Sequence, residues 1–417
     1  MYPYLFIIFV VLMAFGFAFE KALEVLNASR FGIPIPDVFK KYFPQDFQTQ
    51  SVAYQKSKYH YSLIQGSISF LATFLFWILG GFGWLSAEIS QLFTNEIIRT
   101  LVFFGALGAA SGLVSLPFTY YFHFVIEEKY GFNKMTLKTF IGDQIKSGLL
   151  AILLGGGLIA LVVWVYQAAP EKFWWLVWLL MSVIMIFLTA FYAQLIVPLF
   201  NKQTKLEDGE LRTAIQGFAK KAGFSLAHIF VMDGSKRSSK ANAYFTGLGS
   251  KKRIVLYDTL IHDLETKEIV AVLAHEVGHY QHRHTLYNIV LGILQTGFML
   301  FVLSLFIAPD SQIGLAVNRV VAQDPRLMQT HFYLGLIGFG IVYSPVSTIL
   351  GILMNMLSRS FEYQADAFAA KHTRAEDLKT ALVKLSKNSR SQLSPHPFYV
   401  FVYYSHPTLL QRFKELS

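Results

Sequence analysis

The segment His275-Glu276-Val277-Gly278-His279 combines two imidazoles with a carboxylate. Residues four apart lie on one face of a helix, so His275 and His279 can bind the same metal ion. Glu276 is turned by about 100° from His275 on a helix and can reach a water on that ion. This pattern predicts a zinc site, one per chain, in which Glu276 acts as the general base in peptide hydrolysis.

A hydrolytic zinc site needs one more protein ligand and leaves one coordination position open. Glu362 and Asp366 are four residues apart in an apolar setting, so we expect both on one face of a second helix. Glu362 is predicted as the third ligand, and Asp366 is predicted to accept the N–H of a ligating histidine. His282 is the alternative third ligand, although we expect residues 281–284 to form a solvated cap at a membrane boundary.

The composition indicates a membrane protein. The chain has 417 residues, no cysteine, 54% hydrophobic residues and 15% charged residues, against about 25% charged in soluble domains. A membrane helix needs about 20 mostly apolar residues. Seven stretches without Asp, Glu, Lys or Arg meet this requirement: Met1 to Phe19, Tyr59 to Ala87, Thr100 to Ile126, Ser147 to Pro170, Phe173 to Asn201, Thr285 to Pro309 and Leu327 to Ser358. The sequence therefore predicts a mainly α, polytopic membrane protein with seven transmembrane helices.

Two charge-free stretches need separate treatment. The first stretch could be a signal peptide, but it has no basic start and no A-x-A site follows, so we interpret it as an uncleaved helix. The stretch from Ser391 to Gln411 contains three prolines and many polar residues. We predict a loop or an aromatic interfacial segment around Phe398 to Tyr404.

The basic residues give an orientation. The formal net charge is +10. If Met1 starts outside, the predicted outer loops hold four of the 36 Lys and Arg residues: Arg99, Lys172, Arg319 and Arg326. This asymmetry follows the positive-inside rule and predicts an outer or lumenal N-terminus. Because topology accounts for the charge, we expect no nucleic acid partner.

Two hydrophilic blocks, 202–284 and 359–417, face the same predicted side and lack linkers. We predict that together they form one α+β metalloprotease domain, divided by membrane helices in 285–358 and preceded by membrane helices in 1–201. The first block is expected to contain a helix, two strands and a hairpin, and the second block an amphipathic helix. The expected elements are the helix Asp208 to Ala222, capped by Gly223, strands His228 to Met232 and Arg253 to Tyr257, a hairpin strand Asn242 to Gly247 closed by Gly249-Ser250-Lys251, and the helix Arg374 to Leu385.

The segment Asn242-Ala243-Tyr244 is predicted to be an edge strand that binds the substrate. A protease acting on many sequences must bind the peptide backbone, and strand addition to an open edge achieves this. The alternative is an ordinary hairpin strand that only supports the sheet.

The H-E-x-x-H helix, the Glu362-x-x-x-Asp366 pair, the Asn242-Ala243-Tyr244 segment and Ser405-His406-Pro407 together resemble the type I CAAX prenyl endopeptidases. The resemblance extends over nearly the whole chain, and the zinc core is also similar to that of shorter heat-shock membrane metalloproteases. It implies a helical barrel around a water-filled chamber, capped by the protease domain on the cytosolic side of a bacterial inner membrane or an endoplasmic reticulum membrane. It also implies cleavage of prenylated CAAX proteins.

The resemblance offers His406 as a catalytic donor to the oxyanion. The alternative is that Ser405 caps a helix that begins at Pro407. Arg412 is predicted to bind a substrate carboxylate or a zinc-site acid, and the alternative is an ordinary surface arginine.

Two other functions fit the residues. A general quality-control protease for membrane proteins would use the same chemistry on unprenylated substrates. A seven-helix transporter or receptor would use the zinc structurally, but it would be expected to carry charges inside its spans. The expected partners are a peptide or protein substrate and the lipid bilayer.

Overall fold

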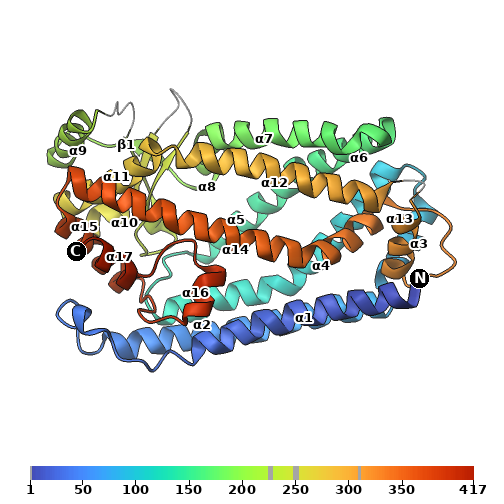
Figure 1. Cartoon of the computed structure of the whole chain (residues 1–417), viewed down its shortest axis with the longest axis horizontal. Helices are drawn as coiled ribbons and strands as arrows, with labels where there is room; N and C mark the ends of the chain where they lie inside the picture. The colour runs from blue at the N-terminus through green and yellow to red at the C-terminus, as the bar shows by residue number, and fades with distance from the viewer. Residues whose placement is uncertain (1, 224–228, 248–252, 309–310) are drawn as a thin grey trace.

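The computed structural model describes residues 2–223, 229–247, 253–308 and 311–417. Within these residues, seven helical segments are long and apolar enough to cross a membrane. The segments run roughly along the long axis of the molecule (Figure 1). They are α1 (Tyr2–Ala28); α2 (Phe47–Ile78); α4 (Glu96–Tyr121) with η2 (Phe122–Glu127); α5 (Leu137–Leu150) with η3 (Ala151–Gly156) and α6 (Gly157–Ala168); α7 (Phe173–Leu195) with η4 (Pro170–Lys172) and α8 (Val197–Phe200); α12 (His284–Ile307); and α14 (Phe332–His372).

The seven spans form a closed ring. Contacts run from α1 to α2, from α2 to η2 at the end of α4, from α4 to α6, and then through α7, α12 and α14 back to α1. In four of the spans, only 6% of the most apolar 18-residue stretch is buried. A filled bundle would cover a whole stripe of each helix, so this low burial is expected of a ring that encloses open space. The predicted seven-helix barrel is confirmed.

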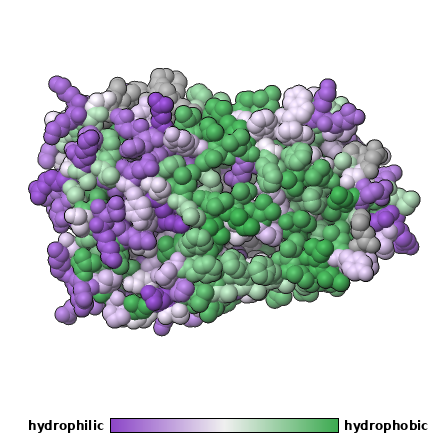
Figure 2. Space-filling model, in the orientation of Figure 1, coloured by the Kyte–Doolittle hydropathy of each residue, from purple (hydrophilic) through white to green (hydrophobic). Residues whose placement is uncertain are grey.

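The surface agrees with a membrane position for the ring. Figure 2 shows hydrophobic residues gathered over the middle of the long axis and hydrophilic residues at both ends. Many large apolar side chains of the spans are exposed, including Leu113, Ile152 and Leu153. Exposed apolar surface of this extent indicates contact with lipid.

One end of the ring is closed by two shorter helices, α3 (Gly81–Leu92) and α13 (Gln312–Ala322), which contact each other. The second predicted span thus stops at Ile78, and Gly80 turns the chain into α3 with φ +78°. Glycine tolerates this conformation because it has no Cβ. The buried core here combines aromatic and aliphatic side chains, and Trp77 donates to the Val320 carbonyl oxygen at 3.1 Å.

The other end carries a four-stranded sheet in the order β1-β2-β4-β3. The strands β2 and β4 are parallel, and the other two pairs are antiparallel. The expected strands and hairpin pairing are confirmed within the described residues, whereas His228 and the closing segment Gly249 to Lys251 lie outside them. The strands are β1 (Gln203–Lys205), β2 (Ile229–Met232), β3 (Ala243–Thr246) and β4 (Arg253–Tyr257).

Helices from both hydrophilic blocks pack around one core at this end. The expected helix before Gly223 is present, and Gly223 adopts φ +62° as its cap. The helix near Arg374 is also present and contacts α11 from the first block. The helices at this end are α9 (Glu210–Lys221), α10 (Asp258–Asp263), α11 (Thr266–Gln281) and α15 (Ala375–Asn388), with the short turns η1 (Asp37–Phe39) and η5 (Gly234–Lys236).

The stretch from Ser391 to Gln411 is not a plain loop. It contains α16 (Pro397–Tyr403) and the start of α17 (Leu409–Glu415). Pro397 occupies the first position of α16, where its missing N–H costs nothing. The cap of α17 is Thr408, in a capping box with Gln411, so the alternative with Ser405 as the cap is wrong.

One of the predicted domain limits does not coincide with the end of a helix. The limit at 358/359 lies inside α14, which continues for 41 residues without a break. The helix therefore brings residues 359–372 directly from the membrane ring to the sheet end, where it contacts α11. The division into four segments stays a prediction.

Candidate active site

The helix α11 carries the H-E-x-x-H segment. It begins with a capping box in which Glu265 and Glu268 each accept a hydrogen bond from the other's backbone N–H. Lys384 from α15 pairs with the buried Glu268 at 2.8 Å. The apolar face of α11 packs into the core beneath the sheet, which fixes the helix that holds His275 and His279.

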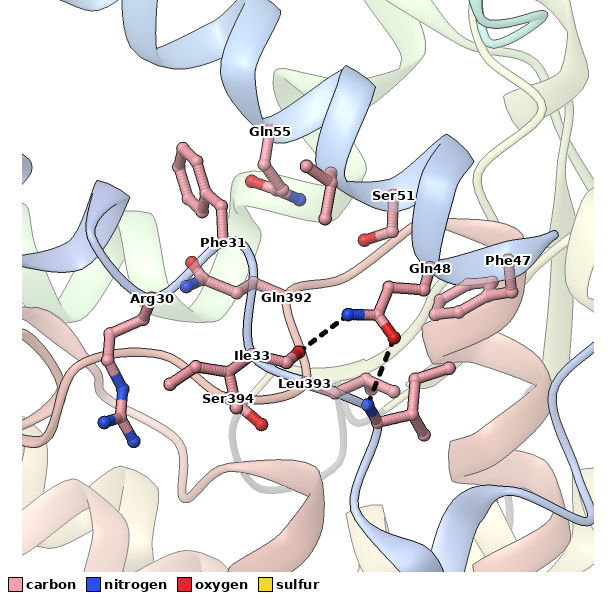
Figure 3. A pocket seen from close by; sticks show the side chains of 12 residues that line it. Arg30, Phe31, Ile33, Phe47, Gln48, Ser51, Gln55, Gln392, Leu393 and Ser394 are labelled. Atoms are coloured by element: carbon pink, nitrogen blue, oxygen red, sulfur yellow. Dashed lines mark hydrogen bonds between the residues drawn. The ribbon is translucent and has the colours of Figure 1, made fainter. Parts of the chain in front are cut away.

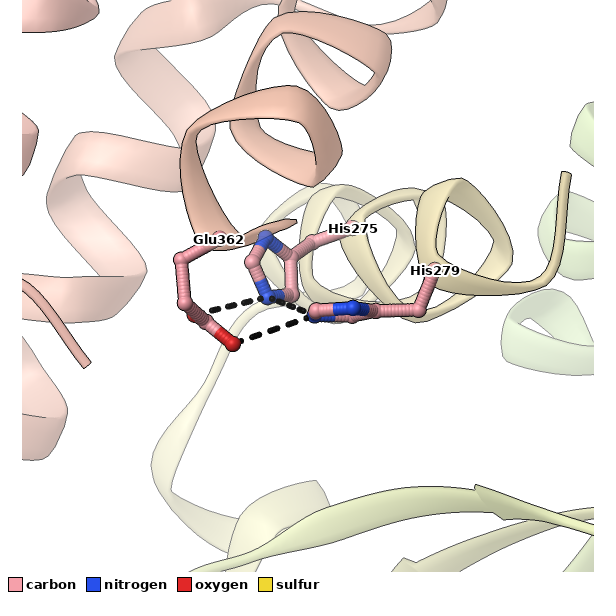
Figure 4. Close-up of side chains that lie close together, drawn as sticks. All are labelled: His275, His279 and Glu362. Atoms are coloured by element: carbon pink, nitrogen blue, oxygen red, sulfur yellow. Dashed lines mark hydrogen bonds and ion pairs between the residues drawn. The ribbon is translucent and has the colours of Figure 1, made fainter. Parts of the chain in front are cut away.

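Three side chains from α11 and α14 converge (Figure 4). His275 Nε2 and His279 Nε2 lie 3.2 Å apart. The two oxygens of Glu362 lie 3.2 Å from His279 Nε2 and 3.4 Å from His275 Nε2. The three side chains can each offer a ligand atom to one ion.

The donor atoms fit a metal ion. Ligands about 2.0–2.2 Å from a tetrahedral ion lie roughly 3.3–3.6 Å from one another, close to the distances observed. Glu362 Oε2 is buried and makes no hydrogen bond within the described part of the chain. Lone pairs of imidazoles and a carboxylate that face one another repel unless a cation lies among them, so these residues could hold a divalent ion.

Asp366 and Arg412 support His275 from behind. His275 Nδ1 lies 2.8 Å from Asp366 Oδ1, and Arg412 Nε donates to Asp366 Oδ2 at 2.8 Å. Burial opposes charge on His275, but its hydrogen bond to Asp366 and the nearby Glu362 carboxylate prevail and raise the pKa of His275 to about 9. The two carboxylates therefore attract positive charge to this imidazole, as a proton or as a metal ion.

A surface arginine or an arginine that binds substrate would be expected to be exposed, but Arg412 is not. Its side chain is 11% exposed, and Nη2 lies 2.5 Å from Asp366 Oδ1. Burial disfavours the charged guanidinium, but hydrogen bonding to Asp366 outweighs this and raises the pKa of Arg412. Of the roles predicted for it, pairing with an acid of the site is the one that the structure shows.

His284 supports His279, and the sequence did not indicate this role. The Nδ1 atoms of His279 and His284 lie 2.9 Å apart, and His284 Nε2 lies 3.0 Å from Gln364 Oε1. The expectation of a solvated cap holds for His282, which is exposed, and is wrong for His284, which is buried. The sequence alone could not show this role, because His284 meets Gln364, 80 residues further along the chain, only in the folded protein.

Glu276 and His406 line the same pocket of about 300 Å³ as His275 and Glu362. His406 is 64% exposed, and its Nε2 lies 3.3 Å from Glu362 Oε1. Ser405 Oγ lies 2.9 Å from His406 Nδ1 and orients the ring. A carboxylate and an imidazole thus lie on the walls of one pocket beside two of the three candidate ligands, His275 and Glu362.

The strand β3 lies at the edge of the described sheet, beside β4. Asn242 and Ala243 line the pocket, whereas Tyr244 does not and instead lies beside the Tyr257 ring at 6.4 Å. The Asn242 carbonyl oxygen accepts from Tyr257 N–H. Because strand residues alternate, the Ala243 N–H points away from β4, where it bonds to the Asn242 side chain at 2.9 Å.

Two family models match the chain. Residues 24–202 match the model for the N-terminal part of CAAX prenyl proteases, described as having five membrane helices. Residues 205–417 match the model for peptidase family M48. The two matches meet near the predicted boundary at 201/202.

Similar proteins and a similar structure cover most of the chain. CAAX prenyl protease 1 of Saccharomyces cerevisiae is 40% identical, over 78% of this chain and 73% of its own. The homolog from Arabidopsis thaliana is 35% identical, over 96% and 95%. The crystal structure of S. mikatae Ste24p superposes with a TM-score of 0.91 at 32% identity, covering 98% of this chain and 99% of that one.

These matches agree with the site geometry. A peptidase of this kind uses a metal cofactor, and the cluster of two histidines and one glutamate offers a place for it. The alternative of a transporter or receptor is therefore wrong. The chain is a multi-pass membrane metallopeptidase that belongs to the CAAX prenyl protease group of peptidase family M48.

Proposed function

We propose that this protein is a zinc endopeptidase that removes the C-terminal tripeptide of prenylated proteins. The observation that carries the proposal is the convergence of His275, His279 and Glu362, two of which, His275 and Glu362, line one pocket together with Glu276. Two histidines and one carboxylate form the ligand set that catalytic zinc prefers. The substrate class is supported by the relatives, whose names describe them as CAAX prenyl proteases.

His275, His279 and Glu362 would hold the zinc, which would supply Lewis acidity to activate a water near neutral pH and to polarise a peptide carbonyl. Glu276 accepts the proton of the attacking water and later transfers it to the leaving amine. His406 donates a hydrogen bond to the developing oxyanion. Asp366 fixes the imidazole of His275 by accepting its Nδ1–H, and Arg412 fixes Asp366.

The strand β3 holds the substrate backbone in this mechanism. The outward N–H of Ala243 is bonded only to the neighbouring Asn242 side chain within the described residues, so a substrate carbonyl can replace that partner. Replacing Ala243 by proline removes this donor. We expect cleavage to fall sharply while metal content stays near that of wild type, and normal cleavage would place the substrate elsewhere.

The central experiment compares purified protein on a farnesylated peptide and on the same peptide without the lipid. Cleavage of the farnesylated peptide three residues from its end, with one zinc per chain by metal analysis, is expected. Equal cleavage of both peptides would favour the quality-control alternative. The matched control is Glu276→Gln, which should keep its zinc and lose cleavage because only the general base is removed.

We also propose that the N-terminus is outside or lumenal and that the catalytic end is cytosolic. The two termini lie at opposite ends of the long axis (Figure 1), and the basic residues are concentrated on the catalytic side. Reporters fused after Ser417 and in the connection from Lys129 to Thr136, before α5, should both be cytosolic. A lumenal or periplasmic signal from either one would reverse the orientation.

A further inference from the structure

A second pocket adjoins the candidate active site. It has a volume of about 530 Å³ and is lined by α2, by residues 389–393 and by residues 403–409. Four residues line both this pocket and the active-site pocket: Ser386, Ser389, Ser391 and His406. A peptide that lies across the candidate metal site can therefore extend into the second pocket, which we call the lysine pocket.

The lysine pocket has a surplus of positive charge. Its lining includes Lys58 and Lys240 and contains no carboxylate. Lys240 is already neutralised, because its Nζ lies 2.6 Å from Oε2 of the buried Glu127. Lys58 has no carboxylate partner among the described residues and lies 5.3 Å from the centre of the Tyr54 ring. A half-buried cation without a partner is costly, so this pocket favours an anion.

The edge strand β3 begins close to this pocket in the sequence. A peptide that adds antiparallel to β3 runs from the end of β3 toward its beginning at Ala243. Its C-terminus is therefore directed toward Lys240, three residues before the strand begins. Three extended residues span about 10 Å, so a short C-terminal segment beyond the cleaved bond is suited to reach from one pocket into the next.

The wall between the two pockets is held by the same helix that carries Lys58. The Arg390 carbonyl oxygen accepts from Gln55 Nε2 at 2.8 Å and from Ser51 Oγ at 3.1 Å. Figure 3 shows Gln55 and Ser51 beside Gln392 and Leu393, around a cavity of about 30 Å³. This cavity is large enough for little more than a water, so the helix that carries Lys58 packs closely against residues 392–394.

We propose that Lys58 binds the C-terminal carboxylate of the substrate, with Lys240 beside it. The inference rests on the proposed removal of a C-terminal tripeptide and adds a reason for the position of the cut. The carboxylate in the lysine pocket would set the distance from the chain end to the cleaved bond. A peptide with a neutral end would lack this contact.

The test uses one farnesylated peptide with a free C-terminal carboxylate and the same peptide with a C-terminal amide. For wild type, we expect kcat/KM to be about 10- to 100-fold higher for the free acid, the usual size of one charge-assisted contact. The Lys58→Gln variant should lose most of this preference, chiefly through KM, since the contact lies away from the reacting atoms.

The control is Lys56→Gln, which removes an exposed lysine from the same helix and should keep the preference. Lys240 is unsuitable for the first test, because its loss would leave Glu127 buried and unpaired. A wild-type enzyme that cleaves acid and amide equally would overturn the proposal. A preference that survives in Lys58→Gln would also overturn it.

Binding separates this proposal from the proposed function. Both peptides, fluorescently labelled, are titrated onto Glu276→Gln and onto Glu276→Gln combined with Lys58→Gln. Tighter binding of the acid that depends on Lys58 supports the lysine pocket even if no prenylated peptide is cleaved. Equal binding of acid and amide rejects the pocket even if cleavage is observed.

Discussion

The two ends of α14 are buried for opposite reasons. At its first turn, Phe332, Tyr333 and Leu334 are 3%, 0% and 0% exposed and pack against apolar residues of the ring and of α13. Thirty residues later, Glu362 and Asp366 are 3% and 0% exposed, but their neighbours are histidines and an arginine. One helix thus connects a buried cluster of apolar side chains with a buried cluster of charged side chains.

The two ends of α14 should therefore contribute differently to the stability of the fold and to its activity. Apolar burial lowers the free energy of the folded state without requiring a ligand, whereas buried charges are weak stabilisers that often serve a function. Substitutions at the first end should therefore change the free energy of unfolding alone. Substitutions at the second end should change metal binding and activity more than stability.

The largest expected effect is that of Glu362→Ala. Removing a candidate ligand from a three-ligand site should reduce zinc from one per chain to near zero and reduce kcat/KM on the order of 1,000-fold or more. Zinc is measured by metal analysis of the purified variant, with exposed Glu210→Ala as the control. Undiminished zinc would move the third ligand elsewhere, with His282 as the next candidate.

Asp366→Asn should have the next largest effect. The amide keeps the size of the side chain but loses the charge that holds His275 and Arg412. Loss of such a supporting contact usually weakens metal binding by about 10- to 100-fold, which competition with a chelator measures. The exposed Asp208→Asn is the control, and an unchanged zinc affinity would show that Asp366 has only a structural role.

The residues at the charged end of α14 could be predicted from their spacing. A spacing of four residues places Glu362 and Asp366 on one face whatever the tertiary structure, and H-E-x-x-H has the same property. Both sets of residues converge in the structure. The existence of the spans was likewise predictable, because membrane thickness sets a minimum length for an apolar helix that crosses it.

The features that the sequence could not predict depend on segments that meet only in the folded chain. His284 contacts Gln364 across 80 residues, and Arg412 contacts Asp366 across 46. The sequence also does not show that α14 continues through residue 358, because charged residues after an apolar run indicate the end of a membrane span. Helical structure does not require an apolar environment, so the helix continues beyond the ring.

Two glycines provide a matched test of the two ends. A Cβ on Gly338 would lie 2.1 Å from Val317 Cγ1, and a Cβ on Gly278 would lie 2.9 Å from Ala365 Cα. Each glycine lets α14 approach a neighbouring helix, so each Ala variant should lose about 1–3 kcal/mol of stability by overpacking. Thermal unfolding in detergent measures this loss.

The two variants should differ in activity. Gly278→Ala pushes α14 away from α11 and should weaken zinc binding, whereas Gly338→Ala should leave kcat/KM of the folded protein unchanged. Gly340→Ala is the control on the same helix, because nothing lies within 4 Å of its added Cβ. Equal loss of zinc in Gly278→Ala and Gly338→Ala would mean that the two ends are not independent.

The smallest expected effect is that of Tyr333→Phe at the apolar end. The Tyr333 hydroxyl lies 2.9 Å from Ser86 Oγ, and both residues are buried. The substitution keeps the ring packing and removes one hydrogen bond, at a net cost of about 0.5–1.5 kcal/mol.

Part of this cost comes from leaving Ser86 unpaired, so adding Ser86→Ala should destabilise the protein less than the sum of the two single variants. Unfolding of the four proteins in the cycle measures the coupling. Strict additivity would show that the two hydroxyls do not interact, and a loss of zinc in Tyr333→Phe would contradict the separation between the two ends of α14.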